Sequence, residues 1–471
     1  MPSPRSLLGP RGIVDSFHHQ REVALADESR AGIFSGRVAV LFGTQVFGAA
    51  VGIVNGILLA RLLGPAAKGD YYILIILPAT TMVLIQLGLP QAFGFFAARG
   101  QTVGMVMKAM VLTVFLSASA FVVLIVFMPV IRTAFLHAIS LDLILFAFLA
   151  LPLALNATFT SGIVTGRQAV RWYAGVNMAY PVATTALLVI VLGGISQSVG
   201  AALAVYLIAS SIQTVGFAIG ARHVIRSVPE ATPVTYRELF RYGLPFFPGS
   251  LSQFFSARAD VFLIAFLIPD PSAALGYYSL AVGLAELVFF FPNAVATLYF
   301  PHVAGSEREE SDRQVAMVSR VALLVTAIVG VALVPGAIVL ITTLLPAYLP
   351  ALPALFVLLP GVVALSTTKI VYGYVTGIRM PAITSYINIF AFVLNIALNL
   401  ILIPMYGIVG ASASSMVSYT VSSLVFTMIA ARLANARVRD FWIPRASDVR
   451  FLFDMTVAIV RRARGGTPAT T

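Results

Sequence analysis

Residues 321–345 read VALLVTAIVGVALVPGAIVLITTLL, without a single Asp, Glu, Lys or Arg. A helix of about 20 apolar residues crosses the hydrocarbon core of a bilayer, and the segments 41–63, 111–131 and 141–164 are long and apolar enough to do the same. Over the whole chain 59% of residues are hydrophobic and 10% are charged, whereas soluble domains carry a charge on about a quarter of their residues. The sequence therefore predicts an all-α integral membrane protein with many spans, and not a soluble enzyme.

Twelve apolar segments of this kind follow one another along the chain. They lie at 38–62, 71–97, 105–131, 140–165, 171–194, 198–221, 241–268, 275–300, 316–345, 351–377, 381–404 and 407–433. Several contain an internal Pro or Gly, which membrane helices tolerate because neighbouring groups satisfy the freed backbone. We therefore expect twelve transmembrane helices.

The basic residues are distributed unevenly between the two sides of these spans. Of the 30 Lys and Arg residues, 25 lie in the two tails and in the loops of one side, whereas the other side holds Arg61, Lys68 and Arg132. Cytoplasmic loops carry the excess of Lys and Arg, so both termini are expected in the cytoplasm. This topology, together with contact to anionic membrane lipids, accounts for the net charge of +12, and no nucleic-acid partner is expected.

Several kinds of chemistry have no supporting residues in the chain. It contains no Cys, which excludes disulfides, thiolate metal sites and cysteine nucleophiles. No phosphate-binding G-x-x-x-x-G-K-[ST] motif and no helix with metal-ligand spacing occurs. We therefore expect no metal and no cofactor, and transport driven by an ion gradient, the membrane potential or the gradient of the substrate.

An internal repeat indicates how the spans are grouped. Residues 66–71 and 273–278 share the pattern A-A-x-G-x-Y, and each copy follows one long span and precedes another. Six spans per half bring both halves in from the same side, so the repeats are parallel and related by an axis along the membrane normal. The expected architecture is two six-helix lobes around a central cavity.

The predicted domains follow from these boundaries. They are an N-terminal cytoplasmic tail at 1–37, a first lobe at 38–221, a cytoplasmic linker at 222–240, a second lobe at 241–433 and a C-terminal cytoplasmic tail at 434–471. In the last tail a short apolar stretch is followed by arginines. Such a pattern is typical either of a helix lying at the membrane interface or of a simple stop-transfer anchor.

Four charged residues stand out inside the predicted spans, where an ionisable side chain usually faces a partner or a wet cavity. They are Arg258, Asp260, Glu286 and Lys369. Asp260 and Glu286 lie about 15 Å below the outer ends of their helices, and Arg258 is placed to pair with Glu286 or with an acidic or phosphate group in the cavity. Such a pair either locks two helices together or holds a substrate or coupling ion.

Lys369 has no acidic residue in its own predicted span. An unpaired cation there suits an anionic ligand, although a lysine near the inner end of a helix can also extend its ammonium to the headgroups. Both interpretations stay open at the level of sequence.

Several motifs, taken in order, resemble one family of transporters. They include Gly69-Asp70-Tyr71, Gln86-Leu87-Gly88-Leu89-Pro90, Arg258-Ala259-Asp260 and, over 395–411, the pattern N-x-x-x-N followed by IP-x-YG-x-x-GA. Over about residues 35–433 the chain resembles the polysaccharide and O-antigen flippases of the multidrug, oligosaccharidyl-lipid and polysaccharide exporter superfamily.

The resemblance implies a V-shaped, two-lobed fold that alternates between inward-open and outward-open states. The implied substrate is a polyprenyl-diphosphate-linked oligosaccharide, moved from the cytoplasmic to the outer leaflet of a bacterial inner membrane for polysaccharide, O-antigen or lipopolysaccharide synthesis. Arg258 and Lys369 would then attract the diphosphate, and Asp260 and Glu286 would orient these cations or couple transport to protons or sodium. Glycan polymerases become candidate partners.

Two features set this chain apart from parts of the superfamily. Lipid II flippases carry fourteen spans, whereas twelve are expected here. The drug-antiporter branch often has an acidic residue in its first span, and residues 38–60 contain none. A cation-coupled multidrug exporter that uses Asp260 or Glu286 is the first alternative function, and a non-transporting scaffold for glycan synthesis is the second.

Overall fold

The computed structural model describes residues 10–136, 139–226, 232–293, 295–296, 303, 308–377 and 381–450, with side chains from Val40 onward except at 42, 134, 253, 376–377, 381–382 and 385. The described part is helical, and its only extended pairing is an isolated bridge between Val103 and Pro233. The C-terminal stretch at 451–460, where the sequence suggests an interfacial helix or an anchor, lies outside the described residues.

The chain enters the membrane through a long helix that is interrupted at glycines. Helix α1 extends over Pro10–Ile85 and breaks at Gly64, where φ is 74°. After residues 86–88, helix α2 continues at Leu89–Ala98 with Gly88 at φ 69°. Only glycine adopts such angles without strain. The predicted second span at 71–97 is therefore divided in two, and the predicted tail at 1–37 is helical from Pro10.

The remaining helices follow the apolar segments. They are α3 Met105–Phe135, α4 Leu141–Phe148, α5 Ala150–Gly166, α6 Val170–Leu187 with a π-helical turn at Leu188–Leu192, α7 Val199–Arg226, α8 Tyr236–Gly243, α9 Phe247–Leu267, α10 Pro271–Glu286, α12 Arg308–Leu344, α13 Ala351–Gly377, α14 Pro381–Leu433 and α15 Arg439–Trp442. Helix α14 breaks at Gly407, where φ is 58°.

Nine helices of the described residues are long and apolar enough to cross a membrane. A tenth span results if Tyr236–Ser252 and Phe254–Leu267, which meet at a bend of 46°, are counted as one. The described residues thus form an all-helical structure with many helices able to span a membrane.

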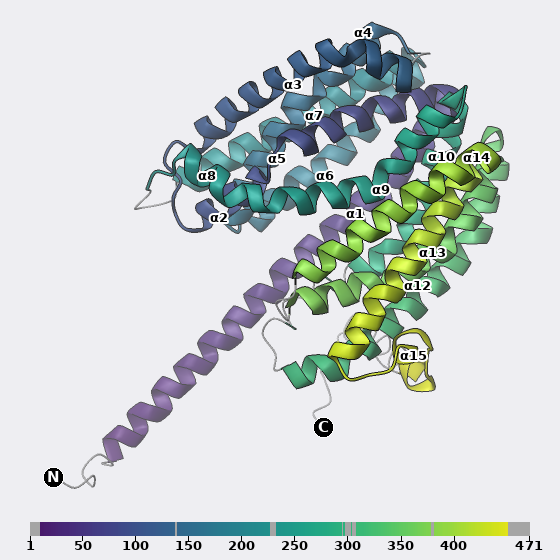
Figure 1. Cartoon of the computed structure of the whole chain (residues 1–471). Coiled ribbons are helices and arrows are strands. Elements are labelled where there is room, and N and C mark those ends of the chain that lie inside the picture. Colours follow the sequence, from purple (N-terminus) through teal and green to yellow (C-terminus); the bar gives the residue numbers. More distant parts are fainter. Residues whose placement is uncertain are drawn as a thin grey trace.

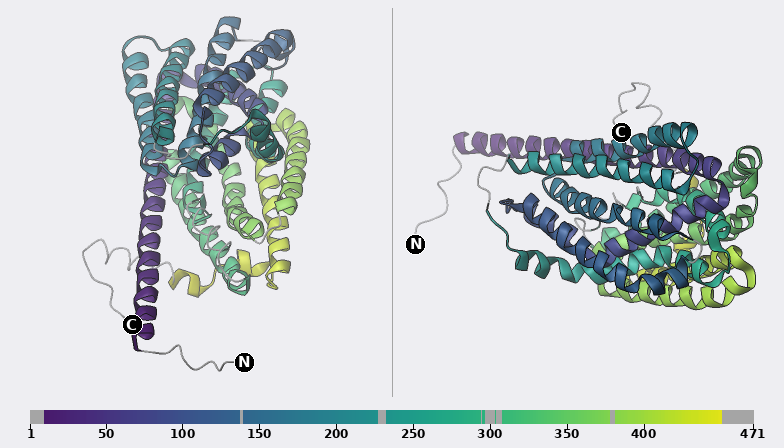
Figure 2. Two further views of the ribbon diagram at one scale, coloured as in Figure 1. Left: turned by 90° about the vertical axis from the view of Figure 1, so that its left-hand side faces the viewer. Right: turned by 90° about the horizontal axis from the view of Figure 1, so that it is seen from above.

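The helices form two groups that approach each other at one end (Figures 1 and 2). Helices α2 to α8 lie in one group, α10 and α12 to α14 lie in the other, and α9 packs mainly on α14. The groups diverge toward α8 on one side and α15 on the other. At the end where they meet, a continuous apolar core joins residues of α1 and α5 to residues of α10 and α14.

The two copies of the sequence repeat pack against each other at this end. A Cβ on Gly69 would overlap the carbonyl oxygen of Ser272, and a Cβ on Gly276 would overlap the carbonyl oxygen of Pro65. The Ser272 hydroxyl also donates a hydrogen bond of 2.6 Å to Asp70. The repeated glycines are therefore the residues that let the backbones of α1 and α10 cross in contact.

The segment that the sequence marks as a linker, 222–240, is anchored to the first group of helices. Thr235 and Glu238 form a reciprocal capping box at the start of α8, which ends the linker in a defined helix. Leu239 is fully buried, and the ring of Tyr242 stacks on Phe95 of α2 with centroids 4.1 Å apart. Helix α8 thus packs on α2, whereas the following helix α9 packs on α14.

Candidate functional site

Arg258 and Glu286 form an ion pair between α9 and α10. The Arg258 guanidinium donates to the Glu286 carboxylate at 3.2 Å, as the spacing of the two residues in the sequence suggests. Glu286 is the last residue of α10, before a 3-10 turn at Leu287–Phe289. The two side chains are 28% and 46% exposed, so the pair remains accessible from outside the protein core.

Asp260 lies apart from this pair and is buried. It accepts hydrogen bonds from the hydroxyl of Tyr278 on α10 and from the backbone N–H of Val261, and it is 6% exposed. Two residues along a helix correspond to about 200° of rotation, which explains why Arg258 and Asp260 face different neighbours. Asp260 therefore joins α9 to α10 through Tyr278.

Lys369 of α13 lies near the same end of α10. Its ammonium lies 5.3 Å from the ring centroid of Phe289, three residues after Glu286, and it is partly buried. The charge of Glu286 acts on Lys369 as it does on Arg258. Arg258, Glu286 and Lys369 thus lie together at this end of α10. Asp260 acts on Arg258 through its charge but is buried and hydrogen-bonded to Tyr278.

A cavity of about 260 Å³ lies between α1 and α10. Its lining combines small and apolar residues with two charged ones: Ala49, Gly52, Ile53, Gly56, Ile57, Lys68, Ser279, Leu280, Gly283, Leu284, Glu286, Leu287 and Phe290. Glu286 therefore connects the ion pair to an open space. Lys68, which the sequence assigns to an outer loop, is 7% exposed and lines this cavity.

Two tyrosines near the charged residues could not be singled out from the sequence. Tyr72 of α1 lies near Arg258 and interacts with its guanidinium, and Tyr419 of α14 lies within electrostatic range of Arg258, Glu286 and Asp260. The sequence contains 16 tyrosines, and no spacing rule distinguishes these two. Tyr278 could be singled out from the sequence, because it is the last residue of the second copy of the repeat.

The motif N-x-x-x-N on α14 has a structural role. Asn395 donates hydrogen bonds to the hydroxyls of Ser415 and Ser418 at 3.3 and 3.2 Å, and Asn399 donates to Asn395 at 2.9 Å. These serines follow the break at Gly407, so the amides connect the two arms of α14. Such interhelical bonds stabilise packing in lipid.

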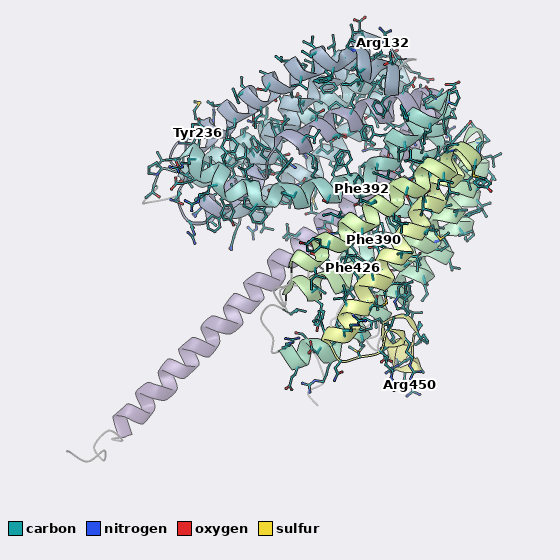
Figure 3. All side chains as sticks on the ribbon, viewed as in Figure 1. Arg132, Tyr236, Phe390, Phe392, Phe426 and Arg450 are labelled. Atoms are coloured by element: carbon teal, nitrogen blue, oxygen red, sulfur yellow. The ribbon has the colours of Figure 1, made fainter. Side chains whose placement is uncertain are left out.

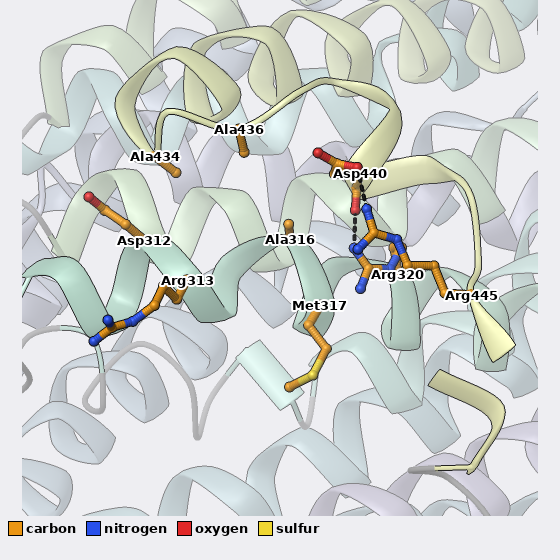
Figure 4. A pocket seen from close by; sticks show the side chains of 9 residues that line it. All are labelled: Asp312, Arg313, Ala316, Met317, Arg320, Ala434, Ala436, Asp440 and Arg445. Atoms are coloured by element: carbon orange, nitrogen blue, oxygen red, sulfur yellow. Dashed lines mark hydrogen bonds and ion pairs between the residues drawn. The ribbon is translucent and has the colours of Figure 1, made fainter. Parts of the chain in front are cut away.

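A second cavity, of about 280 Å³, lies where α12 meets the segment after α14 (Figure 4). Arg320 is 6% exposed at its side chain, donates to Asp448 at 2.8 Å and also donates to the carbonyl of Asp440. We call Arg320, Asp440 and Asp448 the C-terminal clasp. Burial would raise the pKa of Asp448, but hydrogen bonds from the Arg320 guanidinium and from the backbone N–H of Arg445 outweigh it and hold that pKa below its usual value.

Figure 3 places three exposed residues at different ends of the molecule. Tyr236 and Arg450 lie at the separated ends of the two helix groups, and Arg132 lies at the far end of the upper group. Tyr236 and Arg450 belong to segments that the charge distribution assigns to the cytoplasm, and Arg132 belongs to the opposite set.

A family model described as "Polysaccharide biosynthesis protein" matches residues 36–307. Among curated proteins, the chain is 24% identical over 173 residues to "Probable flippase AglR" of Haloferax volcanii, covering 35% of this chain and 36% of that relative. It is 22% identical over 396 residues to "Probable low-salt glycan biosynthesis flippase Agl15" of the same organism, covering 82% of this chain and 81% of that relative. The chain therefore spans about a third of the length of the first relative and most of the second.

Solved membrane transporters share the fold. An inward-facing multidrug resistance transporter of the MATE family and MOP superfamily superimposes with a TM-score of 0.62 at 12% identity, over 82% of this chain and 96% of that one. Lipid II flippase MurJ in an inward closed conformation superimposes with a TM-score of 0.59 at 15% identity, over 85% of this chain and 89% of that one. At these identities the likeness concerns the fold alone.

Proposed function

Because this chain belongs to the polysaccharide biosynthesis protein family, we propose that it is a flippase for a polyprenyl-diphosphate-linked oligosaccharide. It moves this lipid from the cytoplasmic to the outer leaflet for glycan assembly. The curated relatives with flippase names support this function. Transport of this kind requires binding and reorientation of the substrate, and no covalent step.

The proposal includes twelve membrane crossings. The apolar parts of α1 and α14 contain 43 and 48 residues, so a straight helix of either length would be about 65–70 Å long, twice the ~30 Å of a hydrocarbon core. The breaks at Gly64 and Gly407 divide each into two crossings, which raises ten spans to twelve. The lobes are then 38–221 and 241–433, joined through 222–240, with tails at 1–37 and 434–471.

The proposed orientation makes the structure an inward-open state. Both termini lie in the cytoplasm of a prokaryotic cell, and the ends at which the helix groups diverge face the cytoplasm. A lipid headgroup can then enter between the groups while its polyprenyl chain stays in the bilayer. Closing this side and separating α1 from α10 at the other side would release the headgroup outward.

The accessible Arg258–Glu286 pair is the observation that carries the proposed site. An arginine in a low-dielectric cavity is costly unless it meets an anion, and a diphosphate accepts charge-assisted, bidentate hydrogen bonds from a guanidinium. Arg258 and Lys369 attract the diphosphate, and Glu286 orients Arg258 until the substrate replaces it. Asp260 orients α9 through Tyr278. Glu286 or Asp260 is also the group through which a proton or sodium ion would couple.

The test is the leaflet distribution of the lipid-linked oligosaccharide, measured with a membrane-impermeant probe. In cells with Arg258→Glu at normal expression, the intermediate should accumulate in the cytoplasmic leaflet as it does in cells without the protein. Arg132→Glu, which reverses an exposed charge far from the cavity, should leave the distribution unchanged. Full transport by Arg258→Glu would contradict the assigned site.

The fold shared with multidrug transporters favours one alternative, a cation-coupled exporter. A drug-susceptibility panel distinguishes the two functions. An unchanged leaflet distribution together with increased drug sensitivity in cells without the protein would favour the exporter. Preserved glycan output after neutralisation of Arg258, Asp260, Glu286 and Lys369 would instead favour a scaffold that works with glycan polymerases.

A further inference from the structure

Lys68 is a buried basic residue that forms no ion pair with any described residue. Its side chain lies on α1 directly after the break at Gly64 and is 7% exposed. Among the described residues, no carboxylate lies within ion-pair distance of its ammonium, which is 5.3 Å from the ring centroid of Tyr348. The neighbouring Asp70 accepts its hydrogen bond from Ser272 instead. A ring face compensates a buried ammonium only in part.

The Lys68 side chain lies next to an open space. Lys68 lines the cavity between α1 and α10, and glycines form parts of both walls. A Cβ added to Gly52, Gly56 or Gly283 would meet no atom within 4 Å, so the space exists because no side chains fill it. Its second charged residue, Glu286, is already paired with Arg258. The Lys68 amine is therefore the one charge-bearing group of this lining that has no ion-pair partner among the described residues.

Lys68 lies at a different level from the Arg258–Glu286 pair, of which Glu286 lines the cavity. Gly69, next to Lys68, packs on Gly276, which is ten residues before Glu286. Ten residues of α-helix correspond to about 15 Å. Lys68 thus lies toward the end where the helix groups meet, and the Arg258–Glu286 pair lies toward the end where they diverge.

We propose that Lys68 forms a second anion-binding subsite, separate from Arg258, which takes a phosphate or diphosphate group. An ammonium inside a cavity of low dielectric binds phosphate oxygens through charge-assisted hydrogen bonds. The subsite rests on the proposed function for its role in transport, where it receives the diphosphate after Arg258 and before release. Binding itself depends on the cavity and can be measured without transport.

The test is anion binding by the purified full-length protein in nanodiscs. Two probes separate the sources of the anion: inorganic pyrophosphate as a free ion, and a polyprenyl diphosphate incorporated in the nanodisc as a lipid headgroup. Lys68→Met removes the charge and keeps the length of the side chain, and Lys68→Arg keeps the charge. Lys108→Met is the control, because Lys108 bonds the Val103 carbonyl at the surface and lies outside the cavity.

Lys68→Met should weaken binding of at least one probe about tenfold or more, as expected when a charged hydrogen bond is lost. Lys68→Arg and Lys108→Met should stay within a few-fold of the parent protein. An effect on the lipid alone identifies the headgroup as the ligand, and an effect on both probes identifies a general phosphate site. Unchanged affinity of Lys68→Met for both probes would overturn the subsite, as would a parent protein that binds neither.

Two further measurements separate a binding role from a structural one. Without ligand, Lys68→Met should unfold at the same or a higher temperature than the parent, because it removes a buried, unpaired charge; a large loss of stability would show that Lys68 holds the fold. Binding that is lost in Arg258→Met and intact in Lys68→Met would refute the subsite and leave the flippase standing. If binding depends on Lys68 but cells without the protein show an unchanged leaflet distribution, the subsite stands and the flippase function is refuted.

Discussion

Glu286 holds Arg258 in one position at a depth where a lone guanidinium would be costly. Because both side chains remain partly exposed, the proposed substrate anion can take the place of Glu286 beside Arg258 without unfolding of the helices that carry the pair. Asp260, two residues from Arg258, has the opposite character, since it is buried against Tyr278. Neighbouring charges in one helix thus have different partners and different burial according to the face on which they lie.

The amides of α14 lead to a prediction at the same scale. Asn395→Ala should reduce the stability of the protein by about 1–2 kcal/mol, because it removes the hydrogen bonds to Ser415 and Ser418 and leaves Asn399 without its acceptor. Thermal unfolding in nanodiscs measures the change. The matched control is Asn177→Ala, since the Asn177 amide bonds the Tyr173 carbonyl of its own helix. Equal losses in the two variants would contradict the role assigned to Asn395.

At the scale of elements, the crossing of α1 and α10 depends on two glycines. Gly69→Ala or Gly276→Ala should destabilise the structure by about 1–3 kcal/mol, because the added methyl group overlaps backbone atoms of the other helix. The same variants should slow transport, since the helix groups no longer close fully at this end. Gly336→Ala is the control, as its Cβ would meet no atom within 4 Å. Parent-like stability and transport in all three variants would refute the close crossing.

The C-terminal clasp joins the start of α12 to the segment that follows α14. Arg320→Met should raise the rate of amide hydrogen exchange across residues 434–450, because it leaves Asp448 buried without its partner, a loss of about 3 kcal/mol. Arg445→Met should have a small effect, since its pair with Asp440 is 56% and 23% exposed. If both variants exchange alike, the burial of Arg320 does not matter for this segment.

The clasp should also respond to acid. The pKa of Asp448 is lowered in the folded protein, so its stabilising effect is complete above the unfolded pKa of about 4 and is lost as the pH falls through the lowered pKa. Hydrogen exchange in residues 434–450, corrected for its intrinsic pH dependence, should therefore increase below about pH 4. In Asp448→Asn this acid-dependent step should be absent; a step that persists would assign the effect to another group.

At the scale of the whole molecule, the divergence of the two helix groups defines which side is open. The chain has no Cys, so single cysteines report topology without background. Tyr236→Cys and Arg450→Cys, at the separated ends of the groups, should react with an impermeant maleimide only from the cytoplasmic side. Arg132→Cys should react only from outside. The opposite labelling pattern would show that the protein has the opposite orientation in the membrane, and the same structure would then be an outward-open state.

Much of the fold could be predicted because the bilayer restricts what a chain can form. The sequence alone shows the long apolar runs, the A-A-x-G-x-Y repeat and the charges within the spans. Exact helix ends were harder, since α1 is helical through the polar residues from Pro10 and the span at 71–97 divides at residues 86–88. Boundaries of this kind depend on neighbouring helices and on glycine angles.

The sequence by itself determined that the protein spans a membrane many times and that Arg258 could reach Glu286, because helix length and the turn between two helices follow from residue spacing alone. Only the tertiary structure decided that Lys68 is buried beside a cavity, that Asp260 bonds Tyr278 and that Asn395 connects the two arms of α14. The physical reason is that the apolar pattern does not specify how each helix is rotated about its own axis. In lipid every face of a helix is apolar, so the direction in which a single polar side chain points is set by packing against neighbouring helices.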